Sequence, residues 1–119
     1  MTKSTKSIAE LTSLRKPISA LTEYIRSYQS ADPTPERRKG FRALVSMSGP
    51  DVQWARLLLS IVNDCEENEE LLQYCEDSGL IDRETFDFYS RPENARRLRD
   101  EIKELSQLRK QANELLKAN

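Results

Sequence analysis

"ARRLRDEIKELSQLRKQANELL" spans residues 95–116 and repeats apolar side chains at alternating steps of three and four residues. This period is typical of one face of an α-helix and of a heptad seam. Ser90 and Glu93 have capping-box spacing, and Pro92 falls in the first turn. The pattern predicts a long helix over 91–117 whose seam has one charged defect, at Arg109. The seam positions are Ala95, Leu98, Ile102, Leu105, Arg109, Ala112 and Leu116.

A helix of this length extends roughly 37 Å at 1.5 Å per residue. Five short helices cannot cover such a rod along its whole length. We therefore expect its distal half, 108–119, either to fray or to meet a second copy of the chain. The candidate dimer seam consists of Leu105, Leu108, Ala112, Leu115 and Leu116.

Upstream, the first predicted helix follows one apolar stripe with steps of three and four residues. Pro17 interrupts the stripe, so the pattern predicts either a kink or a fresh helix with Pro17 in its first turn. The six residues at the N-terminus, 1–6, are expected to be a disordered tail. The stripe consists of Ile8, Leu11, Leu14, Ile18, Leu21, Ile25 and Tyr28.

A second helix is predicted to begin with Thr34 as N-cap and Pro35 at the first helical position, and to end near Met47. It buries Phe41, Leu44 and Val45. Gly40 inside it costs about 1 kcal/mol relative to alanine. This glycine indicates either a marginal helix or the close approach of another backbone.

The segment "SMSGPD" (46–51) predicts a break, with Pro50 at the start of a third helix. Asp64 and Glu67 have capping-box spacing and predict the start of a fourth helix, which Gly79 ends. Asp82 is expected to cap a short fifth helix. The third helix is the most hydrophobic and the expected centre of the core, with Val52, Trp54, Ala55, Leu58, Leu59, Ile61 and Val62 inward.

Composition agrees with this pattern. The 119 residues are 37% hydrophobic and 33% charged, with three glycines, and helix-forming residue types are abundant. The expected fold is all-α: an irregular bundle of five to seven helices with a long C-terminal helix, forming one domain over 1–119. No apolar run approaches the roughly 18 residues of a membrane span, and no signal-peptide core is present. We expect a cytoplasmic protein in a reducing compartment.

Charge is segregated along the chain although the net charge is −1. Residues 1–50 carry nine basic and four acidic residues, residues 51–89 carry two and eleven, and residues 90–119 carry eight and five. Such polarity influences the choice of partner and long-range steering, and it does not determine the fold.

The residue content argues against an enzyme. Without histidine, neither a Ser-His-Asp nor a Cys-His arrangement can form within one chain. No glycine-rich phosphate loop or calcium-loop motif is present, and no cofactor or metal is expected. Cys65 and Cys75 would lie about 15 Å apart if one helix contained both, too far to form a disulfide. Cys75 is expected in the core, and Cys65 is expected to be exposed at a helix start.

Two basic sets are the candidate contacts for a partner. They either form solvated helix faces, bind an acidic protein surface, or track the phosphates of a duplex. The preferred function is a non-enzymatic helical protein-interaction module, homodimeric, acting as an adaptor or regulator. The alternative is a nucleic-acid-binding protein that contacts the phosphate backbone of DNA or double-stranded RNA. The two sets are Arg37, Arg38, Lys39 and Arg42, and Arg96, Arg97, Arg99 and Lys103.

Overall fold

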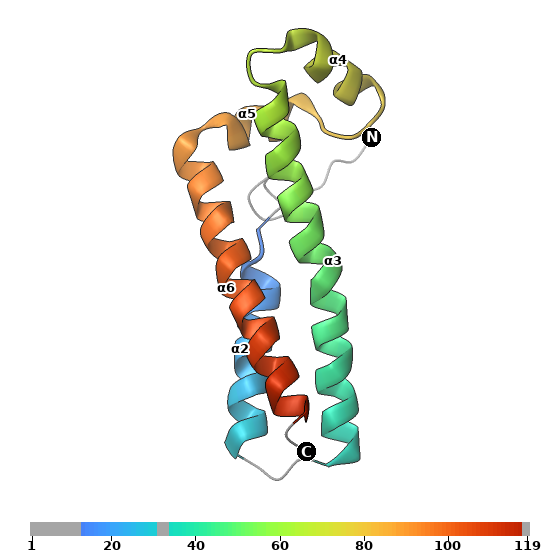
Figure 1. The fold of residues 1–119 in the computed structure, drawn as a ribbon, viewed down its shortest axis with the longest axis vertical. Helices are drawn as coiled ribbons and strands as arrows, with labels where there is room; N and C mark the ends of the chain where they lie inside the picture. Colours follow the sequence, from blue (N-terminus) through green and yellow to red (C-terminus); the bar gives the residue numbers. More distant parts are fainter. Residues whose placement is uncertain (1–12, 31–33, 118–119) are drawn as a thin grey trace, which may run out of the picture.

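The computed structural model describes residues 13–30 and 34–117, and within these residues the secondary structure is entirely helical. In chain order the helices are α2 (Arg15–Ser30), α3 (Pro35–Cys65), α4 (Glu69–Asp77), α5 (Arg83–Ser90) and α6 (Pro92–Lys117). Figure 1 shows three long helices side by side, with α4 and α5 gathered at one end. The all-α prediction is confirmed for this part of the chain. The predicted tail over 1–6 lies outside it.

The helix α2 carries the predicted apolar stripe on its buried face. Leu14, Ile18, Leu21, Ile25 and Tyr28 are all buried. Pro17 stands in the first turn of the helix, where its missing N–H has no partner to lose. The earlier members of the stripe, at positions 8 and 11, lie outside the described residues.

The helix α3 is one continuous rod of 31 residues, so the predicted break at 46–51 is wrong. Its start is as predicted: Thr34 accepts a hydrogen bond from the amide of Arg37, and Pro35 occupies the first position. Pro50 lies inside the helix and has no N–H to give to the carbonyl of Ser46. Packing of the turns on both sides of Pro50 against the rest of the bundle holds the helix together across this defect.

The starts of the later helices differ in part from the sequence patterns. Asn68, and not Asp64, caps α4, because the chain leaves α3 at Cys65 through a short turn with Glu67 at φ 61°. Asp82 caps α5 through the amide of Thr85, as predicted. Ser90 belongs to the end of α5, where its hydroxyl donates to a carbonyl of that helix, so it does not cap α6.

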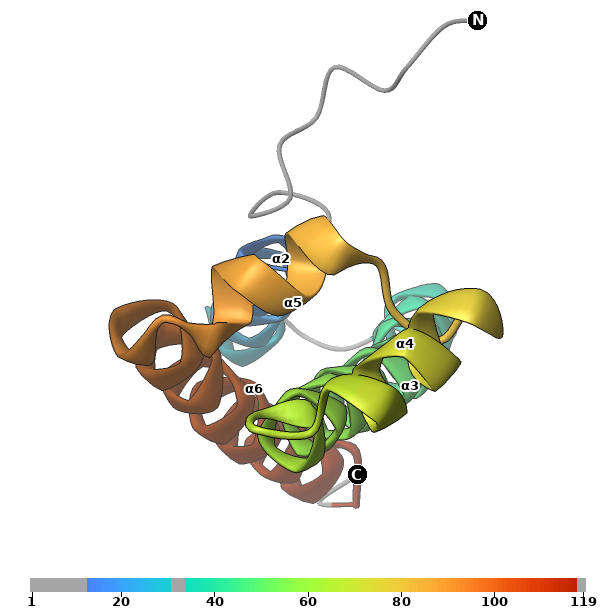
Figure 2. The same ribbon diagram turned by 90° about the horizontal axis from the view of Figure 1, so that it is seen from above.

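The core lies among α2, α3 and α6, which Figure 2 shows from above. The helix α6 runs antiparallel to α3 and parallel to α2, and the molecule is a rod of 54 × 32 × 24 Å. The helix α5 lies across the end of α2 and α6, while α4 lies over the end of α3. Because α3 is nearly as long as the rod, it covers α6 along its length.

An aromatic cluster joins α2 to the start of α3. The rings of Tyr24 and Phe41 stack with centroids 5.5 Å apart, and Tyr28 meets Phe41 at 4.9 Å. A Cβ atom at Gly40 would lie 2.6 Å from the hydroxyl oxygen of Tyr24. The close approach expected at Gly40 therefore comes from a side chain and not from a backbone.

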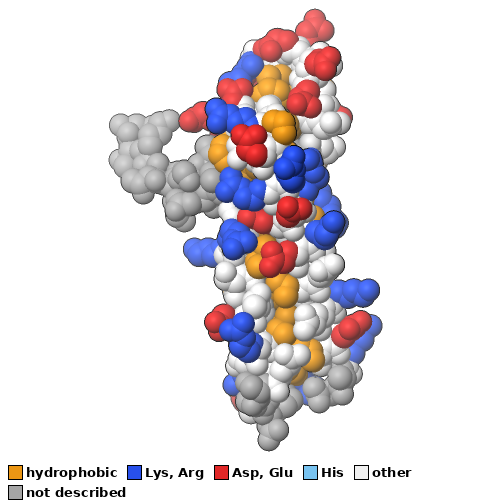
Figure 3. Space-filling view, turned by 90° about the vertical axis from the view of Figure 1, so that its left-hand side faces the viewer, with side chains coloured by type: hydrophobic (Ala, Val, Ile, Leu, Met, Phe, Trp, Pro, Cys, Tyr) orange, Lys and Arg blue, Asp and Glu red, His pale blue; other side chains and the backbone are white. Residues whose placement is uncertain are grey.

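Of the three charge blocks, the acidic one lies at one end of the rod, whereas α6, from the third block, runs along the rod beside α2 and α3. The acidic block covers the C-terminal part of α3 together with α4 and α5, and Figure 3 shows acidic side chains gathered at this end. Arg83 is the cation within the block that bridges two acids, with Nη2 at 2.9 Å from Glu69 and 3.1 Å from Glu76. This arrangement lowers the pKa of Glu69 through the hydrogen bond from Arg83.

Candidate interaction surfaces

Part of the first predicted basic set makes contacts within the chain itself. Arg37 donates from Nη2 to the carbonyl and the hydroxyl of Ser27, which ties the start of α3 to the end of α2. Arg38 is half-buried, whereas Lys39 and Arg42 are exposed. Two of the four residues are therefore free to face a partner.

The second basic set divides in the same way. Arg97 donates to the Oδ1 of Asn94 at 3.0 Å and lines a cavity. Arg96, Arg99 and Lys103 are exposed on the outer face of α6. Because α3 and α6 are antiparallel, the two sets lie toward opposite ends of the rod. The first set is near the end of α6, whereas Arg99 lies about 27 Å along α6 from that end at Lys117. One chain does not bring them together into a single stripe.

The predicted dimer seam on α6 is largely occupied by the chain itself. Leu105 and Ala112 have no exposed surface, and Leu108, Leu115 and Leu116 are half-buried against the core. The premise that no neighbour covers the distal half of α6 is wrong. The premise failed because the residues predicted to form two short helices form the single helix α3, which at 31 residues is longer than α6 at 26.

A different apolar surface is exposed, on α3. Six apolar residues recur along its outer side at steps of four, three, four, three and four residues. Three of them are large and far from buried: Met47 is 69% exposed, Trp54 46% and Leu57 54%. Ala43 and Pro50 are also exposed, and Ile61 is half-buried. We call this set the outer seam: Ala43, Met47, Pro50, Trp54, Leu57 and Ile61.

The outer seam lies about 140° around α3 from the face that packs in the core, at 100° per residue. The core face also repeats at steps of three and four residues, as Val45, Ser48, Val52 and Ala55 show. The placement of Trp54 at the centre of the core is thus wrong. Periodicity identifies both faces of α3 and does not tell which one the chain itself covers.

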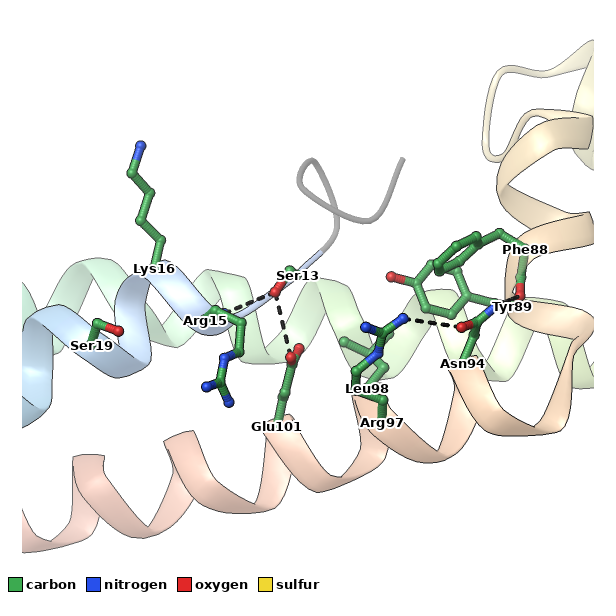
Figure 4. Close-up of a pocket in the computed structure, with 10 residues that line it drawn as sticks. All are labelled: Ser13, Arg15, Lys16, Ser19, Phe88, Tyr89, Asn94, Arg97, Leu98 and Glu101. Carbon is green, nitrogen blue, oxygen red and sulfur yellow. Dashed lines mark hydrogen bonds between the residues drawn. The ribbon is translucent and has the colours of Figure 1, made fainter. Parts of the chain in front are cut away.

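A cavity of about 750 Å³ opens where the start of α2 meets the end of α5 and the first turns of α6. Figure 4 shows its lining: Arg15, Lys16 and Arg97 supply positive charge, and Phe88 and Tyr89 supply aromatic surface. Its size lies within the range of small-molecule pockets. Sequence spacing could not reveal it, since its walls come from three helices.

The cavity contains one buried acid whose role is structural. Glu101 is 5% exposed and accepts a hydrogen bond of 3.0 Å from the amide of Leu14, at the start of α2. Its other oxygen accepts from the hydroxyl of Ser13 at 3.4 Å. A carboxylate at this place satisfies an amide that has no partner within α2 and complements the helix dipole. Glu101 therefore acts as a cap supplied from α6.

A shallow groove between α3 and α6 collects basic side chains that the sequence patterns did not group together. Arg56, Arg109, Lys110 and Lys117 line it, with Glu114 as the acid among them. Arg56 also contacts Ser106 across the groove at 3.3 Å. These cations come from two helices, so only the fold assembles them.

Cys65 and Cys75 are both buried, with their Sγ atoms 3.9 Å apart. Cys75 is a core residue, as predicted, but the exposure expected for Cys65 is wrong. The predicted separation of about 15 Å assumed one helix, whereas Cys65 ends α3 and Cys75 belongs to α4. Burial, reinforced by the neighbouring Cys75 and by the charge of Asp64, raises the pKa of the Cys65 thiol.

Comparison with protein families, curated proteins and solved structures finds no match to this chain. Among the helices of residues 13–30 and 34–117, none is long and apolar enough to cross a membrane. The same residues hold no cluster of three or more histidine, cysteine or acidic side chains arranged to bind a metal ion.

Proposed function

We propose that this protein is a non-enzymatic, cytoplasmic interaction module that acts as an adaptor or regulator by docking a helical protein segment on α3. The observation that carries the proposal is the outer seam, with Met47, Trp54 and Leu57 each about half exposed or more. Apolar residues exposed singly are ordinary on protein surfaces. Six on one helix face at heptad spacing match the surface that receives an amphipathic helix.

The rest of the molecule supports this role. The chain has no histidine, and its one deeply buried carboxylate in the cavity already caps α2. The three-helix core holds α3 along most of its length, so the outer seam is presented on a rigid element. Because α3 is already ordered, it loses little conformational entropy when a partner docks.

Photo-crosslinking tests the proposal in the cells that produce the protein. Trp54 is replaced by p-benzoylphenylalanine, and Gln107 on the outer face of α6 is replaced in a matched control. We expect covalent adducts with polypeptide from position 54 and none from position 107. Equal adduct formation at both positions, or none at position 54, contradicts docking at the outer seam.

Binding to the phosphates of a nucleic-acid duplex is the second candidate function. The basic groove between α3 and α6 favours it, because Arg56, Lys110 and Lys117 gather there. Such binding would weaken steeply as the salt concentration rises. The logarithm of the association constant should fall against the logarithm of the salt concentration with a slope of about −0.9 for each phosphate neutralised. We expect Lys110→Glu with Lys117→Glu to abolish it, and a fluorescent 20-base-pair duplex titrated at low salt measures the loss. Lack of binding by the wild-type chain eliminates this candidate.

A further inference from the structure

We propose that the partner on the outer seam is a second copy of this chain, with the two α3 helices packed antiparallel about a two-fold axis. This inference rests on the proposed function and names its partner. Three features of the seam point to a copy of itself: its layers, its end charges and its flanks.

The layers of the outer seam are self-complementary. In an antiparallel pair of helices, residues face each other when their numbers sum to a constant, and the seam positions of one helix meet the alternate seam positions of the other. A sum of 104 pairs Met47 with Leu57 of the second copy, and Pro50 with Trp54. It also pairs Ala43 with Ile61, so that a small residue meets a large one at each end.

The charges at the ends of the seam also complement each other. The same helical face continues to Lys39 four residues before Ala43 and to Asp64 three residues after Ile61, and both side chains are exposed. Their numbers sum to 103, one less than for the seam layers, so each Lys39 would lie within one residue of the position that faces Asp64 of the second copy. The symmetry forms this ion pair twice. A parallel pair would instead place lysine beside lysine and aspartate beside aspartate.

The flanks of the seam admit a copy. Along the side away from the core, the flanking residues are Ser46, Gln53 and Ser60, all exposed and uncharged. Residues on this flank pair at a sum of 106, two higher than the seam layers, so Gln53 meets its own copy and Ser46 meets Ser60 without repulsion. Residues on the other flank pair at a sum of 102, so Asp51 meets its own copy at the axis, and this is the one like-charged contact that the arrangement creates.

Sedimentation and cysteine trapping on the full chain test the inference. We expect a dimer for the wild type, a monomer for Trp54→Glu or Leu57→Glu, and no change for Gln107→Glu, with circular dichroism confirming that each variant is folded. Lys39→Cys mixed with Asp64→Cys should form an interchain disulfide, while Lys39→Cys alone should not. A wild-type chain that stays monomeric at high concentration overturns the inference.

Charge reversal provides the second readout. At low salt, Lys39→Glu and Asp64→Lys should each weaken the dimer about 3- to 10-fold because two exposed ion pairs become repulsive, and the double variant should restore it. Asp51→Asn should tighten the dimer. Trapping of Lys39→Cys with itself means a parallel dimer, which refutes the antiparallel arrangement. Photo-adducts at position 54 with a different protein and no dimer would refute self-association while leaving the proposed function in place.

Discussion

Arg109 donates a hydrogen bond from Nε to the hydroxyl oxygen of Ser48 at 2.9 Å, joining the C-terminal half of α6 to the turn of α3 just before Pro50. Ser48 in turn donates to the carbonyl of Val45, which Arg109 also approaches at 3.4 Å. The turn that precedes the proline is therefore fixed by α6. The one charged position in the apolar seam of α6 serves this purpose.

Replacing Arg109 by methionine keeps the apolar stem and removes the donor. We expect Arg109→Met to lower the free energy of unfolding by about 1–2 kcal/mol, because hydrogen bonds from charged groups contribute more to stability than hydrogen bonds between neutral groups. Urea denaturation measures the change, and a double-mutant cycle with Ser48→Ala should give a coupling near 1 kcal/mol. Arg99→Met on the outer face of α6 should stay within about 0.5 kcal/mol of wild type. Additive effects of the two substitutions would contradict the contact.

Replacing Pro50 by alanine tests the continuity of α3. A proline inside a helix costs about 3 kcal/mol relative to alanine, so Pro50→Ala should raise the free energy of unfolding by about 1–3 kcal/mol. Pro35→Ala is the matched control, because proline is favoured at the first helical position and no gain is expected there. Both are measured by urea denaturation at one protein concentration. Equal behaviour of the two variants would mean that a new helix starts at Pro50.

The effect of Gly40→Ala on stability should change sign when the hydroxyl group of Tyr24 is removed. In the wild type, Gly40→Ala places a Cβ atom 2.6 Å from the Tyr24 oxygen, and we expect a loss of about 1 kcal/mol of stability. With Tyr24→Phe, the nearest atom is the ring carbon at 3.6 Å. The same substitution should then stabilise α3 by about 0.5–1 kcal/mol. Thermal denaturation of the four proteins measures the reversal, and its absence would refute the contact.

Removing the carboxylate of Glu101 should loosen the start of α2. Glu101→Ala leaves the amide of Leu14 without its partner, so we expect a loss of about 1–2 kcal/mol, as for other caps. Hydrogen exchange at the Leu14 amide should become faster. Glu104→Ala, at an exposed position on the same helix, is the control and should have little effect. Unchanged exchange at Leu14 in the Glu101 variant would exclude the capping role.

The raised pKa of Cys65 predicts a stability that falls in alkali. The unfolded thiol ionises near pH 8.5, whereas the folded thiol keeps its proton to higher pH. The unfolded state therefore binds fewer protons above this point, and the free energy of unfolding should be constant below about pH 8 and fall above it, by at most about 1.4 kcal/mol per pH unit. Chemical denaturation between pH 7 and 9.5 measures the slope. Cys65→Ala should be flatter, and an equal slope would assign the effect to another group.

Local sequence rules identified two of the helix caps and the buried stripe of α2, because caps and periodicity act over a few residues. Thr34 and Asp82 cap their helices as predicted. The same rules wrongly predicted a break in α3 at Pro50. Arg109, which secures the turn before Pro50, lies 61 residues away from Ser48 in the chain. Only the folded molecule brings the two together.

That single error also determined what could be inferred about the candidate site. Splitting α3 left α6 without a partner of its own length and placed the expected dimer seam on Leu105 and Ala112, which the chain itself buries. It also assigned Trp54 to the core. Both faces of α3 have heptad spacing, and no local pattern distinguishes a stripe covered by the same chain from one that is left exposed.

The cysteine pair lies beneath the most loosely attached part of the molecule. The helix α4 rests mainly on the last turns of α3, and the ion pairs of Arg83 with Glu69 and Glu76 join it to α5. Such a nine-residue element can detach while the three-helix body stays folded. Each brief detachment would expose both thiols at once. Their rate of alkylation under native conditions would therefore measure the frequency of this local opening and not of global unfolding.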